Sequence, residues 1–259
     1  MAVVAPDLLA ERARPLALAR EQVLPVLDPL APLLPGGALR RSATVVVSGE
    51  AGPSLAMALV AGPSQAGSWV AVVGLPSLGL LAAAGLGVAL ERLVLVAEPP
   101  PAAWATVMAA LVGAVDIVVA GPPPRVGAGD ARRLAARVRE RGTVVVTLSG
   151  PGARGPGLEV DLRLSAGSAR WEGLGWGHGH LQARRVTVEA VGRREAARPR
   201  RAELWLPGPD GEVGAVVPDA DVLAWPGAAE GVVGGGAPVP VSISSSGPSP
   251  GPGPAPLAG

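Results

Sequence analysis

Short apolar runs alternate with longer segments of helical spacing through the middle of the chain. The apolar runs predict buried strands at 42–47, 69–73, 93–96, 116–119 and 143–148. The segments between them predict helices at 53–66, 78–86, 102–112 and 130–141. Strands and helices that alternate over short links are typical of a mostly parallel sheet with helices on both faces, so the sequence predicts an α/β fold.

The pattern changes after residue 148, where strands joined by turns are expected at 158–164, 185–191 and 202–206. Within the second of these, Val186, Val188 and Ala190 alternate with polar neighbours, so one face of that strand is expected in the core and the other in solvent. We expect a β-rich C-terminal part that closes the parallel sheet.

The two ends of the chain have different compositions from the middle. Residues 7–24 predict a helix kinked at Pro15, and 25–35 form a proline-punctuated connector. Residues 226–259 carry one charge and are rich in Pro, Gly and Ser, which predicts a disordered tail. We therefore divide the chain into an N-terminal helix and connector (1–34), a core (35–225) and a tail (226–259).

Composition narrows the chemistry that is available. There is no Cys, and all 22 basic residues are Arg. The net charge of +1 gives no global electrostatic argument for nucleic acid. Residues 51–90 lack any charge, which would fit a membrane span. Glycines and prolines divide this run into short pieces, however, and buried parallel strands are also apolar throughout. Asp7 and Glu11 near the start do not fit a signal peptide, so we expect a cytoplasmic protein without a membrane segment.

The segment 44–59, TVVVSGEAGPSLAMAL, has the order strand, glycine turn, helix that is typical of a phosphate-binding P-loop. A working P-loop needs G-x-x-x-x-G-K-[ST]. Aligned on Gly52 and Ser54, the chain has Val47 in place of the first Gly and Pro53 in place of the Lys. Proline suits a first helical turn, but it supplies no charge and removes an N–H. The sequence predicts a degenerate P-loop at Gly49, Gly52, Pro53 and Ser54.

Residues 33–206 resemble the core of the RecA recombinase family, through five segments in the family's order. LLPGGALRRSATVVVSGEAG is similar to the lead-in to the family's P-loop, and WVAVVGLPSLGLLAAAGLGVALERLVLVAEP to its second-strand region. GAVDIVVAG resembles the Walker B strand, GTVVVTLSG the strand with the family's sensing Gln, and ARRVTVEAVGRREAARPRRAELWL its basic hairpin. The resemblance implies a RecA-like P-loop fold.

The same resemblance implies that the catalytic groups are missing. The water-activating Glu falls on Leu75 or Pro76, the Walker B Asp on Ala120 or Gly121, and the Gln on Ser149 or Gly150. The family's DNA-contacting loops would map to 121–129 and 149–157, with one Arg each, Arg125 and Arg154. An ATPase-dead RecA relative with a flexible end is similar to the ImuA-type proteins of actinobacteria. That likeness implies DNA-damage-induced mutagenesis beside an ImuB-type adaptor of the Y-family polymerase kind and an error-prone polymerase.

The densest basic cluster is a candidate DNA-binding surface. Its members are Arg184, Arg185, Arg193, Arg194, Arg198, Arg200 and Arg201. A solvated strand face is the alternative interpretation. His178 and His180 are an i, i+2 pair, but without Cys and with few nearby carboxylates we interpret GWGHGHLQ as a flexible glycine loop and expect no metal.

We therefore expect a non-enzymatic RecA-like interaction protein of translesion synthesis that uses no cofactor and binds partners and, weakly, DNA. The alternatives are a nucleotide-binding RecA-like ATPase or recombination mediator with a divergent site, and a membrane-associated protein. Pro53 and the absence of Lys speak against the ATPase.

Overall fold

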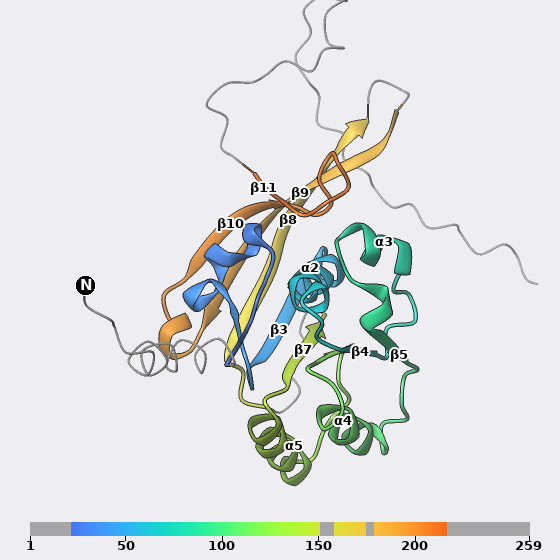
Figure 1. Cartoon of the computed structure of the whole chain (residues 1–259), viewed down its shortest axis with the longest axis vertical. Helices are drawn as coiled ribbons and strands as arrows, with labels where there is room; N and C mark the ends of the chain where they lie inside the picture. Colours follow the sequence, from blue (N-terminus) through green and yellow to red (C-terminus); the bar gives the residue numbers. More distant parts are fainter. Residues whose placement is uncertain (1–21, 151–157, 175–178, 217–259) are drawn as a thin grey trace, which may run out of the picture. The chain divides into compact units, whose positions relative to one another are not determined.

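The computed structural model describes residues 22–150, 158–174 and 179–216, all within one compact unit. Its centre is a nine-stranded sheet in the order β11-β10-β9-β8-β3-β7-β6-β4-β5 (Figure 1). The pairs from β8 to β5 are parallel, and the pairs β8–β9, β9–β10 and β10–β11 are antiparallel. The protein is therefore an α/β protein with a mixed, mostly parallel sheet, as the alternating pattern predicted.

The parallel half follows the predicted elements to within a few residues. Its strands are β3 (Thr44–Gly49), β4 (Val70–Val73), β5 (Leu93–Val96), β6 (Ile117–Ala120) and β7 (Val144–Ser149). The helices between them are α2 (Gly52–Gln65), α3 (Leu80–Gly85), α4 (Trp104–Val112) and α5 (Ala128–Arg141). Because β4, β6 and β7 are sandwiched between helices, apolar residues occupy both of their faces.

Two hydrophobic clusters cover the two faces of the sheet. The first joins α2 to Val45, Val47 and neighbouring strand residues, and the second joins α4 and α5 to Val118 and Val145. The uncharged run 51–90 supplies α2 and β4, both largely buried. Of the helices that the structure describes, none is both long and apolar enough to cross a bilayer.

The antiparallel half is longer than predicted. β8 (Leu162–Leu174) and β9 (Gly179–Gly192) form a hairpin whose outer part extends past the end of β3, and β10 (Arg200–Trp205) and β11 (Gly214–Ala215) follow (Figure 1). The expectation of a strand at 158–164 was wrong in its bounds. Gly167 and Gly173 lie within β8, where shifts in register between Ala166/Ala169 and Glu172/Leu174 accommodate them. Residues 179–182, His180 among them, lie in β9, so the predicted glycine loop at 175–182 is wrong there; residues 175–178 lie outside the described part.

The N-terminal predictions need one correction. Residues 1–21 lie outside the described part, and the end of the expected helix, Val23–Leu24, is the strand β1, which pairs with β2 (Leu39–Arg40). Pro25 disfavours a helical Leu24, which explains the extended backbone. The connector forms the 3-10 helices η1 (Asp28–Leu33) and η2 (Pro35–Gly37), and Leu30 and Leu33 are buried in the first cluster.

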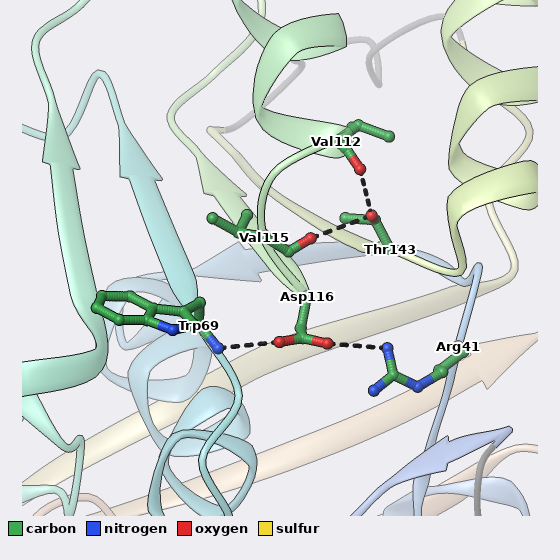
Figure 2. Close-up of polar contacts among 6 residues, drawn as sticks. All are labelled: Arg41, Trp69, Val112, Val115, Asp116 and Thr143. Carbon is green, nitrogen blue, oxygen red and sulfur yellow. Dashed lines mark hydrogen bonds and ion pairs between the residues drawn. The ribbon is translucent and has the colours of Figure 1, made fainter.

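A polar clasp joins the amino ends of three strands (Figure 2). One carboxylate oxygen of Asp116 accepts a bond from Arg41 Nη1 at 3.0 Å, and the other accepts one from the Trp69 backbone N–H at 3.0 Å. Nearby, Thr143 Oγ1 donates to the Val112 carbonyl at 2.6 Å. Asp116 therefore fixes the start of β6 against the starts of β3 and β4.

Candidate functional site

The carboxyl ends of β3, β7, β6 and β4 lie together, because parallel strands end at the same edge of a sheet. Ser48 pairs with Ser149, and Ala120 pairs with Val73. The positions that the sequence related to the P-loop, the Walker B strand and the sensing Gln are thus brought to one edge. Only two residues, Glu50 and Ala51, separate β3 from α2.

The predicted glycine turn at 48–52 is shorter in the structure. Ser48 and Gly49 continue β3 and pair with Ser165 and Ala166 of β8. Gly49 has φ +96°, and a Cβ there would lie 1.9 Å from the Ala166 carbonyl oxygen, so only glycine fits. Residues that would wrap a phosphate in a P-loop are therefore part of the β-ladder.

Few polar groups lie beside the first turn of α2. Gly52, Pro53 and Ser54 begin the helix, and Val47 lies beneath Gly52, with its Cγ1 3.9 Å from where a Cβ on Gly52 would lie. A hollow of about 240 Å³ beside Pro53 and Ser54 is lined by no charged residue. Leu75, one of the two positions to which the resemblance relates the family's water-activating Glu, lines that hollow.

Arg184 of β9 reaches the start of α2. Its Nη2 donates to Ser54 Oγ at 2.6 Å, and its Nε donates to the Leu206 carbonyl at 2.7 Å. The guanidinium also stacks on Trp171 of β8, 5.0 Å from the ring centroid. Burial lowers the pKa of Arg184, and the Glu50 carboxylate opposes that shift. We call Arg184, Trp171 and Ser54 the Arg184 latch.

The two positions that the resemblance relates to the Walker B Asp, Ala120 and Gly121, have no room for a carboxylate that faces α2. Ala120 is fully buried in the second cluster, on the side of α4 and α5. Gly121 follows the buried end of β6, and a Cβ there would lie 2.5 Å from the Gly74 carbonyl oxygen. Backbone therefore occupies the space that an Asp side chain at 121 would need.

The seven candidate DNA-binding arginines do not form one patch. Arg184 belongs to the latch, and Arg185 pairs with Glu203 at 2.5 Å. Arg193, Arg194 and Arg198 follow the end of β9, around η4 (Arg194–Ala196), and Arg200 and Arg201 begin β10, paired with Ala190 and Glu189 of β9. Arg193 pairs with Glu159, Arg201 with Glu189 at 3.9 Å, and Arg200 donates to the Glu195 carbonyl at 3.2 Å. Arg194 and Arg198 are exposed.

Sequence reasoning missed a groove at the amino edge of the sheet. It has a volume of about 840 Å³ and is lined by the β2–β3 turn, the end of α5 and η4. Arg193 and Arg194 share its wall with Arg41 and Arg139, and Glu159 and Asp161 lie in the same wall. No local sequence pattern indicates the groove, because the residues that line it come from segments far apart in the chain.

Other sequence-derived positions fall at the surface or outside the described ranges. Arg125 is exposed in the β6–α5 loop. Arg154, His178 and the whole tail 226–259 lie outside the residues that the structure describes. His180 is exposed, with Gln182 Nε2 3.5 Å from its Nε2.

The fold defines an α/β protein with a mixed, mostly parallel sheet, in which Arg184 of β9 contacts the start of α2. Residues 32–153 match the family model described as the MT3502 N-terminal domain, a region that contains β3 to β7 and α2 to α5. A protein of Mycobacterium tuberculosis, described as uncharacterized protein Rv3395c, is 37% identical over 98 residues. That match covers 38% of this chain and 48% of the relative, so the chain spans about half the length of this curated relative.

Proposed function

We propose that this protein is a RecA-like, non-enzymatic accessory protein of the DNA-damage response and translesion synthesis, and that it acts by binding protein partners and, weakly, DNA. The observation that carries the proposal is the start of α2, where Arg184 of the same chain donates to Ser54. Phosphoryl transfer depends on charge neutralisation and on aligned carboxylates. Pro53, Leu75 and Ala120 supply neither.

The order of the strands supports the RecA-like part of the proposal. The segments that resemble the family's P-loop, second strand, Walker B strand and sensing strand fall on β3, β4, β6 and β7. The segment that resembles its basic hairpin falls on β9 and β10, which pair antiparallel. The match to a mycobacterial protein is compatible with an ImuA-type protein of actinobacteria, whose partners would be an ImuB-type adaptor and an error-prone polymerase.

A calorimetric titration with ATP and Mg²⁺ tests the nucleotide part. We expect no hydrolysis and no binding tighter than millimolar, about 4 kcal/mol. Pro53→Lys should not restore turnover, because the carboxylates stay absent. Micromolar affinity of the unaltered protein would contradict the proposal and favour a nucleotide-dependent activity.

A salt series with single-stranded DNA tests the nucleic-acid part. The variant replaces Arg193, Arg194 and Arg201 by Ala, and it leaves Arg200 in place because Arg200 Nη1 is buried. We expect lower affinity and a salt slope that is flatter by roughly one unit per lost phosphate contact. The matched control replaces Arg132, Arg133 and Arg137 on the exposed face of α5. Equal losses in both variants would show that the η4 region is not the contact.

Recovery of partners from damaged cells tests the biological role. The tagged full chain should co-purify with a polymerase-type adaptor after DNA damage. Co-purification with enzymes of nucleotide metabolism, and not with polymerase components, would contradict the proposed role in translesion synthesis.

A further inference from the structure

β5 is the last strand at one side of the sheet, and in the described part of the chain it pairs only with β4 (Figure 1). Its sequence is Leu-Val-Leu-Val, with no charge and no proline. Val94 is 38% exposed and Leu95 is 55% exposed, and the two side chains lie on opposite faces. An uncovered apolar edge strand is a template for pairing with another strand.

The backbone of β5 shows which of its polar groups face outward. The Gly74 N–H donates to the Val96 carbonyl at 3.1 Å, so Val96 and Val94 direct their backbone groups toward β4. Successive residues of a strand alternate in this direction. The N–H and C=O of Leu95 therefore point to the open side, together with the C=O of Leu93 and the N–H of Ala97.

We propose that the β5 edge is a self-association surface, at which two copies of this chain pair antiparallel about a two-fold axis at Leu95. In this register the two Leu95 residues exchange N–H···O=C bonds. Ala97 of each copy donates to Leu93 of the other. All of these groups are the outward-facing ones, so pairing needs no change in the β4–β5 ladder.

The charges at the two ends of β5 favour a second copy of this chain as the partner. Arg92 precedes the strand and stacks on Trp69, 5.3 Å from the ring centroid, and Glu98 follows it. Arg92 is the last residue of the 3-10 helix η3 (Leu90–Arg92) and Glu98 lies two residues after β5, so the same two-fold pairing brings Arg92 of one copy to the end of the shared ladder where Glu98 of the other lies, and the reverse. A contact about a two-fold axis must be self-complementary. If one residue contacts a second residue of the other copy, the second residue also contacts the first. Opposite charges across antiparallel strands stabilise the pair.

The apolar side chains fit the same arrangement. Val94 of one copy would lie opposite Val96 of the other, and the two Leu95 side chains would meet on the other face. The contact is short, so we expect micromolar rather than nanomolar dissociation, as for small interfaces.

Sedimentation of the full chain from about 1 µM to about 500 µM tests the proposal. We expect a dimer that forms with increasing concentration. Arg92→Glu and Glu98→Arg should each raise the dissociation constant by about tenfold or more, because each places like charges opposite each other. An equimolar mixture of the two variants should associate again, since every charge then meets its opposite. Arg132→Glu on α5 makes the same charge change away from the edge and should have no effect.

Leu95→Pro supplies the backbone test. It removes the outward N–H but no bond of the β4–β5 ladder, and edge strands tolerate proline. We expect a folded monomer with an unfolding transition close to that of the unaltered chain. A monomer at every concentration, a dimer that Leu95→Pro does not weaken, or a variant mixture that stays monomeric would each overturn the proposal.

Discussion

At the scale of single residues, the carboxyl edge of the parallel strands is defined by how closely backbone segments approach one another. Gly49 and Gly121 each lie against a carbonyl oxygen of a neighbouring segment, and Pro53 begins a helix without an N–H. Arg184 then supplies the positive charge at the start of α2. Together these residues make the edge a packed structural element.

Arg184→Ala should reduce the free energy of unfolding by about 1–3 kcal/mol, because Ser54 and the Leu206 carbonyl lose a charged donor. Arg184→Lys keeps the charge but loses the forked geometry, so we expect an intermediate loss. Urea unfolding measures both. Arg170→Ala, an exposed arginine on the same hairpin, is the control and should change little. A stability of Arg184→Ala equal to that of the control would mean that the latch contributes nothing.

Gly121→Ala should cost about 1–3 kcal/mol, since the added methyl meets the Gly74 carbonyl and forces a backbone shift. Gly150→Ala is the control, because a Cβ at 150 has nothing within 4 Å. The denaturant midpoints of the two variants measure this difference in stability. Equal midpoints would contradict the steric argument against a carboxylate at this position.

At the scale of elements, the clasp around Asp116 joins segments that are distant in sequence. One carboxylate ties Arg41, before β3, and Trp69, before β4, to the start of β6. Asp116 is partly buried, so its hydrogen bonds contribute more than those of a solvated pair.

We expect Asp116→Ala to lower the free energy of unfolding by about 1–3 kcal/mol, and Asp116→Asn to cost less because one oxygen still accepts a bond. The comparison is Asp130→Ala, which breaks an exposed i,i+3 pair with Arg133 and should cost less than about 0.5 kcal/mol. Thermal unfolding followed by circular dichroism gives the ranking. An equal loss of stability in Asp130→Ala and Asp116→Ala would contradict this ranking.

The elements that the sequence predicted well are those with one strong periodicity. β5 was predicted with its observed bounds, and in α5 Leu134 and Val138 are buried while the arginines face solvent, as expected. Val186, Val188 and Ala190 are buried on one face of β9, also as expected. The outer hairpin was missed because glycines and histidines there resemble a loop, and only cross-strand pairing reveals the strand.

The residues at the carboxyl edge differ in how far the sequence related them to one another. The resemblance related Leu75, Ala120 and Ser149 to catalytic positions of the family, and the parallel strand order of the structure places them at one edge of the sheet. The Arg184 latch was not predictable, because Arg184 and Ser54 are 130 positions apart and no local pattern relates them. Arg184 was assigned to a solvent-facing basic cluster for that reason.

At the scale of the whole molecule, partner binding through the C-terminal tail is a separate prediction. The tail 226–259, which lies outside the described residues, contains the apolar segment PVPVSI at 238–243. Such a segment can add to a partner's sheet edge. Truncation after Trp225 should leave the melting temperature unchanged and abolish partner co-purification. Retained co-purification would move the partner site onto the folded core.

The position of β3 at the centre of the sheet has a consequence for how the chain folds. Both of its neighbours, β7 and β8, arrive about a hundred or more residues later, and the Thr44 N–H that donates to Asp161 spans 117 positions. The β8–β9 hairpin, by contrast, closes locally. Because loop-closure entropy opposes contacts of long range, we expect the hairpin to form early and β3 to be paired late, which makes this a slow-folding topology. During synthesis β3 would therefore stay apolar and unpaired until most of the chain has left the ribosome.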